Sequence, residues 1–139
     1  MSPIPVKRLL KGTHYATQVW IGDEAARAIA SLDPKVAREV VKKIEIFATG
    51  GFWKFEGKQG VPIRHEENGA YRVRHKESSL YRIVGFYPRK DDGNDDKRRF
   101  IILDAFEKEG PGDKYQPGQW ARILEVGRVR ASGDWRAVD

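Results

Sequence analysis

The chain has 139 residues, of which 40% are hydrophobic and 11% aromatic, which is enough for one domain with a buried core. Its 26 lysines and arginines outnumber its 20 aspartates and glutamates, so the formal net charge is +6. This charge favours a polyanionic partner, most simply a nucleic acid, or an acidic protein. The lack of cysteine excludes disulfides, thiolate chemistry and cysteine-bound zinc. No apolar run approaches the roughly 18 residues of a membrane span and no signal peptide is evident, so we expect a cytoplasmic protein without membrane contact.

The first fifty residues predict a basic arm, one strand and a helical hairpin. Asp23 is a suitable N-cap for a first helix, and Asp33 followed by Pro34 repeats the start signal for a second helix. The second helix carries an apolar stripe and ends at two glycines. In order, we expect an arm over residues 1–12, a strand over 14–21, and helices over 24–32 and 34–48.

The remaining residues predict strands, one long loop and a last helix. Asn68-Gly69 is a strong two-residue hairpin signal, so residues 61–67 are expected to pair with 70–76, although Pro62 indicates an edge or irregular position. A nearly continuous apolar run is typical of a strand covered on both faces. The segments that follow are a strand over 80–87, a solvated loop over 88–99, an apolar strand over 100–106, a helix over 119–130 and a tail over 131–139.

Two alternating segments around residue 78 place cations on one face of a predicted hairpin. If Lys76 faces Leu80, then Arg74 faces Arg82 across the ladder. Like charges directly opposite each other destabilise a sheet by up to about 1 kcal/mol. Such a pair either points into water or holds an anion, and a row of arginines and lysines on a rigid sheet suits a phosphodiester backbone. A solvated strand face is the alternative interpretation. The cationic face comprises Arg72, Arg74 and Lys76, and the opposite face comprises Tyr71, Val73 and His75.

Six short segments of the sequence, taken in order, resemble the RelE/ParE superfamily of toxins. They are VWIGDEA (19–25), LDP (32–34), GG (50–51), AYRVR (70–74), LYRI (80–83) and IILDAFEK (101–108). The resemblance is closest to the HigB-like or phage-derived RelE-like branch and covers residues 18–130. It implies an α+β fold in one domain over residues 1–139, with an antiparallel β-sheet packed on an N-terminal helical hairpin in the order β-α-α-β-β-β-α.

The same resemblance implies a function. Members of the superfamily are toxins of type II toxin–antitoxin pairs, and the RelE and HigB branches cut mRNA in the ribosomal A site without a metal. The expected partners are therefore mRNA on the ribosome and a cognate antitoxin of the helix-turn-helix type, and no cofactor is expected. Two alternatives remain open: a ParE-like inhibitor of DNA gyrase, and a non-catalytic relative that acts as a binding module.

The resemblance also assigns residues. Arg82 matches the strand arginine that contacts the scissile phosphate, and Arg72 with Arg74 matches the basic pair on the preceding strand. Lys108 falls near the basic pair after the last strand, and Tyr115 near the aromatic residue before the final helix. Glu109 departs from the pattern, because a basic residue is expected there. The second basic residue of that pair is therefore missing.

Metal-free RNA cleavage needs a base for the 2′-OH, cations for the phosphorane and an acid for the leaving oxygen. We expect Arg74 and Arg82 to clamp the phosphate. The acid and base remain open among six residues: His65, Glu66, Glu67, His75, Lys108 and Tyr115. The predicted catalytic set is Arg82, Arg74, Lys108, Tyr115 and His65, the predicted RNA-binding set is Arg72, Lys76, Arg64 and Lys58, and no metal site is predicted.

Overall fold

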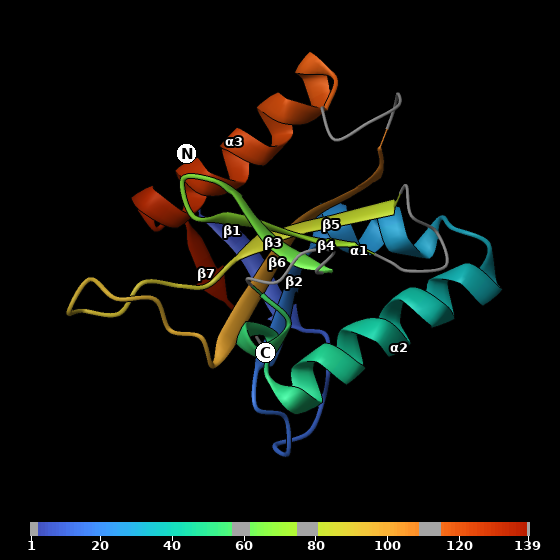
Figure 1. Ribbon diagram of the computed structural model, residues 1–139, viewed down its shortest axis with the longest axis horizontal. Coiled ribbons are helices and arrows are strands. Elements are labelled where there is room, and N and C mark those ends of the chain that lie inside the picture. The colour runs from blue at the N-terminus through green and yellow to red at the C-terminus, as the bar shows by residue number, and fades with distance from the viewer. Residues whose placement is uncertain (1–2, 57–61, 75–80, 109–114, 139) are drawn as a thin grey trace.

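A computed structural model of the chain describes residues 3–56, 62–74, 81–108 and 115–138 (Figure 1). Within these residues the fold is α+β, with a mixed sheet of seven strands and three α-helices. In chain order the elements are β1 (Ile4–Arg8), β2 (Gln18–Gly22), α1 (Asp23–Ala30), α2 (Pro34–Gly50), the 3-10 helix η1 (Phe52–Phe55), β3 (Ile63–Glu67), β4 (Ala70–Arg74), β5 (Tyr81–Phe86), β6 (Arg99–Glu107), α3 (Pro117–Ser132) and β7 (Trp135–Ala137).

The strands follow the order β3-β4-β5-β6-β2-β1-β7. Strands β3 to β6 form an antiparallel meander, but β2 joins β6 in parallel and β7 joins β1 in parallel. The prediction of an antiparallel sheet is therefore wrong for these two pairs, and the expected RelE-like topology is not confirmed. Alternation and apolar runs report which side chains are buried, but they do not report the direction of a strand.

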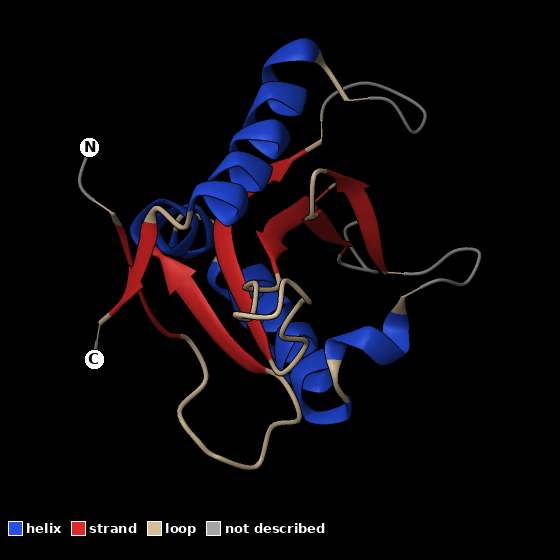
Figure 2. Cartoon of the chain, turned by 90° about the vertical axis from the view of Figure 1, so that its left-hand side faces the viewer, coloured by secondary structure: helices blue, strands red, loops and turns tan. Residues whose placement is uncertain are grey.

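The predicted arm and tail also contain sheet structure. Ile4 N–H donates to Asp134 O at 2.9 Å, and Val138 N–H donates to Val6 O at 2.8 Å. Val6 is fully buried, which fixes β1 in the sheet although prolines obscure its alternation. The short strands β1 and β7 run side by side near the two chain ends (Figure 2). The expectation that residues 1–12 and 131–139 lie outside the sheet is thus corrected.

The predicted pairing of β3 with β4 and the predicted register of β4 with β5 are confirmed, although the β3–β4 register shifts between His65 and Glu67. Asn68 and Gly69 both have positive φ angles, 52° and 86°, as a tight two-residue turn requires, and they connect β3 to β4. Across β4 and β5, Val73 pairs with Ile83 and Arg74 pairs with Arg82. The period-two pattern therefore predicted the faces of these strands correctly.

The predicted helix starts are confirmed with one difference. The Asp33 carboxylate accepts from Lys35 N–H at 3.0 Å and caps α2, with Pro34 in the first helical position. In α1 the N-cap is Gly22, and Asp23 is instead the first helical residue. An acidic side chain there still favours the helix because it faces the positive end of the helix dipole.

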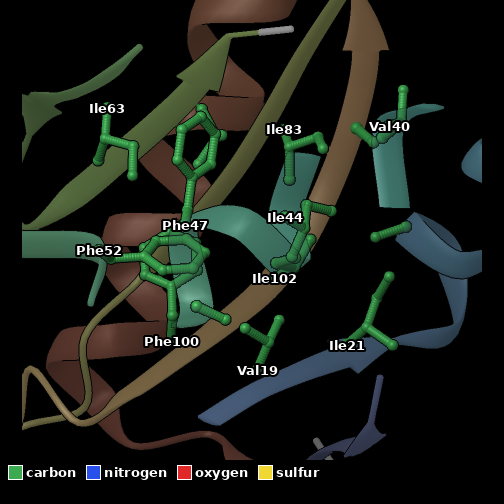
Figure 3. Packing of buried hydrophobic residues seen from close by; sticks show 14 of the residues in the cluster. Val19, Ile21, Val40, Ile44, Phe47, Phe52, Ile63, Ile83, Phe100 and Ile102 are labelled. Atoms are coloured by element: carbon green, nitrogen blue, oxygen red, sulfur yellow. The ribbon is translucent and has the colours of Figure 1, made fainter. Parts of the chain in front are cut away.

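The sheet separates two hydrophobic cores. Helices α1 and α2 cover one face, where Phe52 stacks on Phe100 with ring centroids 4.7 Å apart and meets the edge of Phe47 (Figure 3). Helix α3 covers the other face through Ile123, Val126 and Val129. The arginine-bearing ends of β4 and β5 lie on the α3 side, because Ala70 and Val84 of the same strand faces belong to the α3 core.

An irregularity in β6 fixes α3 on its face of the sheet. Val84 pairs with Asp104 and Gly85 with Ile102, so Leu103 is an extra residue on β6. Leu103 therefore joins the core beneath α3, and the neighbouring Asp104 carboxylate accepts from Arg122 Nε of α3 at 2.7 Å. This ion pair is part-buried and anchors the N-terminal half of α3 above β6.

Candidate nucleic-acid interface

Four arginines from three adjacent strands share the α3 face of the sheet. Arg64 of β3 pairs with Arg72 of β4, and Arg74 of β4 pairs with Arg82 of β5. Since cross-strand partners point to the same side and alternate residues share a face, the four side chains lie on one surface. We call Arg64, Arg72, Arg74 and Arg82 the arginine cluster.

The four side chains of the arginine cluster differ in their exposure to solvent. Arg72 is 8% exposed and Arg82 is 9% exposed, whereas Arg74 is half-buried and Arg64 lies in solvent. Arg82 Nη1 donates to the carbonyl of Tyr81 at 3.3 Å, which holds the guanidinium against its own strand. Arg64 and Arg74 are therefore the members of the cluster that a polyanion can approach from the solvent, and Arg72 and Arg82 lie deeper.

Arg72 has the most strongly perturbed environment of the cluster. Its Nε donates to Glu66 Oε1 at 3.2 Å, and both side chains are largely buried. Burial lowers the pKa of Arg72, and the neighbouring cations Arg82 and Arg74 lower it further, while Tyr115 and Glu66 oppose them. Its Nη1 is buried and finds no acceptor among the described residues. A buried guanidinium nitrogen without an acceptor is unfavourable, and an oxygen of a bound anion would satisfy it.

Tyr115 and Lys108 adjoin the arginine cluster. The Tyr115 hydroxyl donates to Glu66 Oε1 at 3.4 Å, and Lys108 Nζ lies 5.6 Å from the centre of the Tyr115 ring. Burial raises the pKa of Tyr115, and the Glu66 carboxylate raises it further, against the effect of Arg82. Tyr115 therefore holds its proton at neutral pH. The structure thus brings together four of the five predicted catalytic residues, namely Arg74, Arg82, Lys108 and Tyr115.

The fifth, His65, does not join them. It pairs with Tyr71, so it lies on the α2 side of the sheet, where its ring meets the edge of the Tyr71 ring at 5.1 Å. Its Nε2 accepts from Gly69 N–H at 3.0 Å, which braces the β3–β4 turn. The expectation that His65 reaches the basic face is therefore wrong, because the register shift between His65 and Glu67 pairs His65 with Tyr71 instead of Arg72 and so turns it away from the arginines.

Glu66 is a carboxylate that contacts the arginine cluster through Arg72, although no sequence pattern distinguished it from the other acid–base candidates. It lies two residues after Arg64 and shares its face, beside the irregularity between His65 and Glu67. A regular two-residue hairpin would have paired Glu66 with Tyr71, so the sequence did not predict the contact of Glu66 with Arg72. Lys58, His75, Lys76 and Glu109 lie outside the described residues.

A second cluster of titratable residues lies on the opposite face and has a structural role. Lys97 donates to Glu56 at 3.1 Å, and Tyr87 donates to the same carboxylate at 2.5 Å. The Lys97 ammonium also lies 4.5 Å from the centre of the Tyr87 ring. These contacts attach Lys97, near the end of the predicted loop 88–99, to the protein, whereas residues 89–94 are exposed as a solvated loop requires.

The part of the chain that the structure describes contains neither a candidate metal site nor a candidate membrane-spanning helix. In those residues, no group of three histidine, aspartate or glutamate side chains is placed to hold a metal ion. None of the described helices is both long enough and apolar enough to cross a membrane.

Comparison of the sequence with models of known protein families found no match, and comparison with characterised proteins found none either. Function is therefore inferred from the residues of the arginine cluster and their surroundings.

Proposed function

We propose that the chain is a metal-independent endoribonuclease, the toxin of a type II toxin–antitoxin pair that cleaves mRNA on the ribosome. The observation that carries this proposal is the convergence of Arg72, Arg74 and Arg82 on one sheet face beside Tyr115. Guanidinium groups on a rigid sheet bind phosphate through paired hydrogen bonds. The resemblance of segments 70–74 and 80–83 to RelE-like toxins supports the same assignment.

A phosphate would complement this surface. Arg74 and Arg82 place two positive charges in directly opposite positions, and Arg72 carries a buried Nη1 with no acceptor in the described residues. A phosphodiester offers negative charge and acceptor oxygens that guanidinium groups bind. The exposed Arg64 extends the surface so that a neighbouring phosphate of the same strand can also bind.

The cleavage step follows from the groups present. The 2′-oxygen of the substrate attacks the adjacent phosphorus, and the bond from phosphorus to the 5′-oxygen breaks, leaving a 2′,3′-cyclic phosphate and a 5′-hydroxyl. Arg74 and Arg82 stabilise the charge on the phosphorane. Among the described groups that contact Arg72 and Tyr115, Glu66 is the one that can accept the 2′-OH proton, because arginine, lysine and protonated tyrosine are donors. Lys108 or Tyr115 supplies a proton to the leaving 5′-oxygen.

The test is cleavage of mRNA by the purified protein in the presence of programmed ribosomes. Arg82→Ala should reduce the rate on the order of 100-fold or more. Arg38→Ala is the matched control, since Arg38 is an exposed arginine of α2, a helix on the opposite side of the sheet. An unchanged rate in Arg82→Ala would reject the assignment of this residue.

Induced expression separates the alternatives. Rapid arrest of translation with cuts in the ribosomal A site supports the nuclease. An SOS response with DNA breaks would instead indicate inhibition of DNA gyrase, and an absence of any growth defect would indicate a binding module. A neighbouring open reading frame for a small helix-turn-helix protein would supply the antitoxin partner. Because this chain has a net charge of +6, it favours binding of an acidic segment of that antitoxin.

A further inference from the structure

An aromatic ladder leads away from the arginine cluster along the start of α3. The edge of Phe106, a buried β6 residue, meets the Tyr115 ring with centroids 6.3 Å apart. Tyr115 in turn stacks on Trp120, with ring centroids 6.2 Å apart and planes 29° from parallel. Trp120 lies in the first turns of α3 and is only partly buried. The ladder thus ends in a tryptophan that reaches the solvent.

The same ladder is tied to the phosphate-binding groups. Trp120 stacks on Tyr115, Tyr115 contacts Glu66, and Glu66 contacts Arg72. Trp120 is therefore connected to the arginine cluster through Tyr115 and Glu66. Single-stranded RNA is recognised by proteins that hold its backbone with cations and stack its bases on aromatic rings. A partly exposed tryptophan beside a cationic surface provides both features at one place.

We propose that Trp120 is a base-stacking subsite for single-stranded RNA whose phosphate lies on the arginine cluster. This inference rests on the proposed function and adds the group that engages the base. The base stacks on the solvent side of the indole, whose other side is supported by Tyr115. Stacking tolerates every base, because each base offers a π-face, so the subsite adds affinity for unpaired RNA and discriminates little among sequences.

The alternative is that Trp120 only covers Tyr115 and Phe106 from water. The two roles differ in what they require of the ligand, because stacking needs a base and a structural cover does not. The experiment therefore measures binding of a fluorescein-labelled oligoribonucleotide whose 2′-O-methyl groups prevent cleavage, and of the same oligonucleotide with abasic sites. Fluorescence anisotropy gives Kd for the full-length chain and for Trp120→Ala and Trp120→Phe.

For the intact oligonucleotide, Trp120→Ala should raise Kd by about 5- to 100-fold, and Trp120→Phe should retain most of the affinity. For the abasic oligonucleotide, Trp120→Ala should bind as tightly as the wild type does. Trp53→Ala is the matched control, because Trp53 is 38% exposed and belongs to η1 on the far side of the sheet. This control should leave both Kd values unchanged.

Two results would overturn the subsite. One is an equal loss of affinity for intact and abasic oligonucleotides, and the other is no loss for either. Cleavage on ribosomes is measured in parallel with the same proteins. Intact cleavage by the wild type together with either result refutes the subsite alone, whereas base-dependent binding without any cleavage refutes the nuclease and retains the subsite. A chain that neither binds the intact oligonucleotide nor cleaves mRNA on ribosomes refutes both.

Discussion

Arg74 of β4 and Arg82 of β5 are cross-strand partners, so two guanidinium groups rise from directly opposite positions of an antiparallel pair. Because both would contact the same phosphate, the effects of removing them should not be additive. We expect Arg82→Lys to recover little of the activity that Arg82→Ala removes, since an ammonium cannot make the paired hydrogen bonds of a guanidinium. The double variant Arg74→Ala/Arg82→Ala should be impaired by less than the product of the two single effects. Cleavage rates measured as kcat/KM decide this, and full activity of Arg82→Lys would show that charge alone suffices.

Glu66→Gln separates a proton acceptor from a positioning group. The amide oxygen can still accept from Arg72 and from Tyr115, so the local geometry is retained. If Glu66 accepts the 2′-OH proton, the variant should lose about 100- to 10,000-fold in rate. Cleavage rates on programmed ribosomes measure this loss, and a loss below about tenfold would leave Glu66 only a positioning role.

Arg64→Ala tests whether the exposed end of the arginine cluster binds a phosphate of the RNA. For single-stranded RNA, removing one phosphate-binding cation should reduce the slope of log Kd against log salt by about 0.7. Arg64 is exposed, so its removal should have little effect on folding. Titrations of an oligoribonucleotide at several salt concentrations give the slope, with Arg38→Ala as the reference. Equal slopes for the two variants would remove Arg64 from the interface.

Tyr81→Phe should alter stability at alkaline pH. The Tyr81 hydroxyl is buried and has no hydrogen-bond partner in the described part of the chain, and burial, with a further effect of Asp104, raises its pKa to about 12. Between pH about 10 and 12 the unfolded chain has lost this proton while the folded chain retains it. The unfolded state then binds fewer protons, so stability falls as pH rises through this window, and it is fully present below it.

The variant should therefore lose less stability than the wild type between pH 9 and pH 11. At neutral pH it should be more stable by about 1 kcal/mol, because an unsatisfied buried hydroxyl is removed. Urea denaturation at both pH values measures the two effects. Parallel losses in the two proteins would mean that Tyr81 titrates normally in the folded state.

Gly85→Ala and Gly118→Ala form a matched pair for packing. A Cβ at Gly85 would lie 2.3 Å from the Ile101 carbonyl oxygen and 2.6 Å from the Phe100 ring, so neighbouring backbone must move. We expect a loss of about 3 kcal/mol, at the upper end of what overpacking costs. A Cβ at Gly118 meets nothing within 4 Å, and alanine there should be neutral or stabilising by up to about 1 kcal/mol. Thermal or urea denaturation of both variants tests this, and similar stabilities would contradict the close approach at Gly85.

The sequence predicted the local pairing well because a two-residue turn and a period-two pattern together set the register. Asn68-Gly69 determined the β3–β4 hairpin, and the position of Arg74 opposite Arg82 followed from the length of the β4–β5 connection. The parallel contact of β2 with β6 could not be predicted in this way. Those strands are far apart in the sequence, and the apolar run of β6 shows only that both of its faces are buried.

The candidate site was predictable to the same extent. Residues on β4 and β5 were placed correctly because their strands were, whereas His65 was misplaced because the register shift between His65 and Glu67 turns it away from the arginines. The contribution of Trp120 depends on how α3 packs over β6, which an irregularity at Leu103 determines. No local sequence pattern signals that irregularity.

The pairing of β1 with β7 has a consequence for how the chain folds. Ile4 and Trp135 are partners, so this edge of the sheet joins segments from opposite ends of the sequence and carries a large loop-closure entropy. During synthesis the outer edge of β1 stays unpaired until β7 has emerged from the ribosome. An unpaired strand edge can form hydrogen bonds with strands of other chains and so promotes aggregation. Shortening the chain before residue 135 should therefore increase aggregation of the nascent protein, even though none of the arginine cluster is removed.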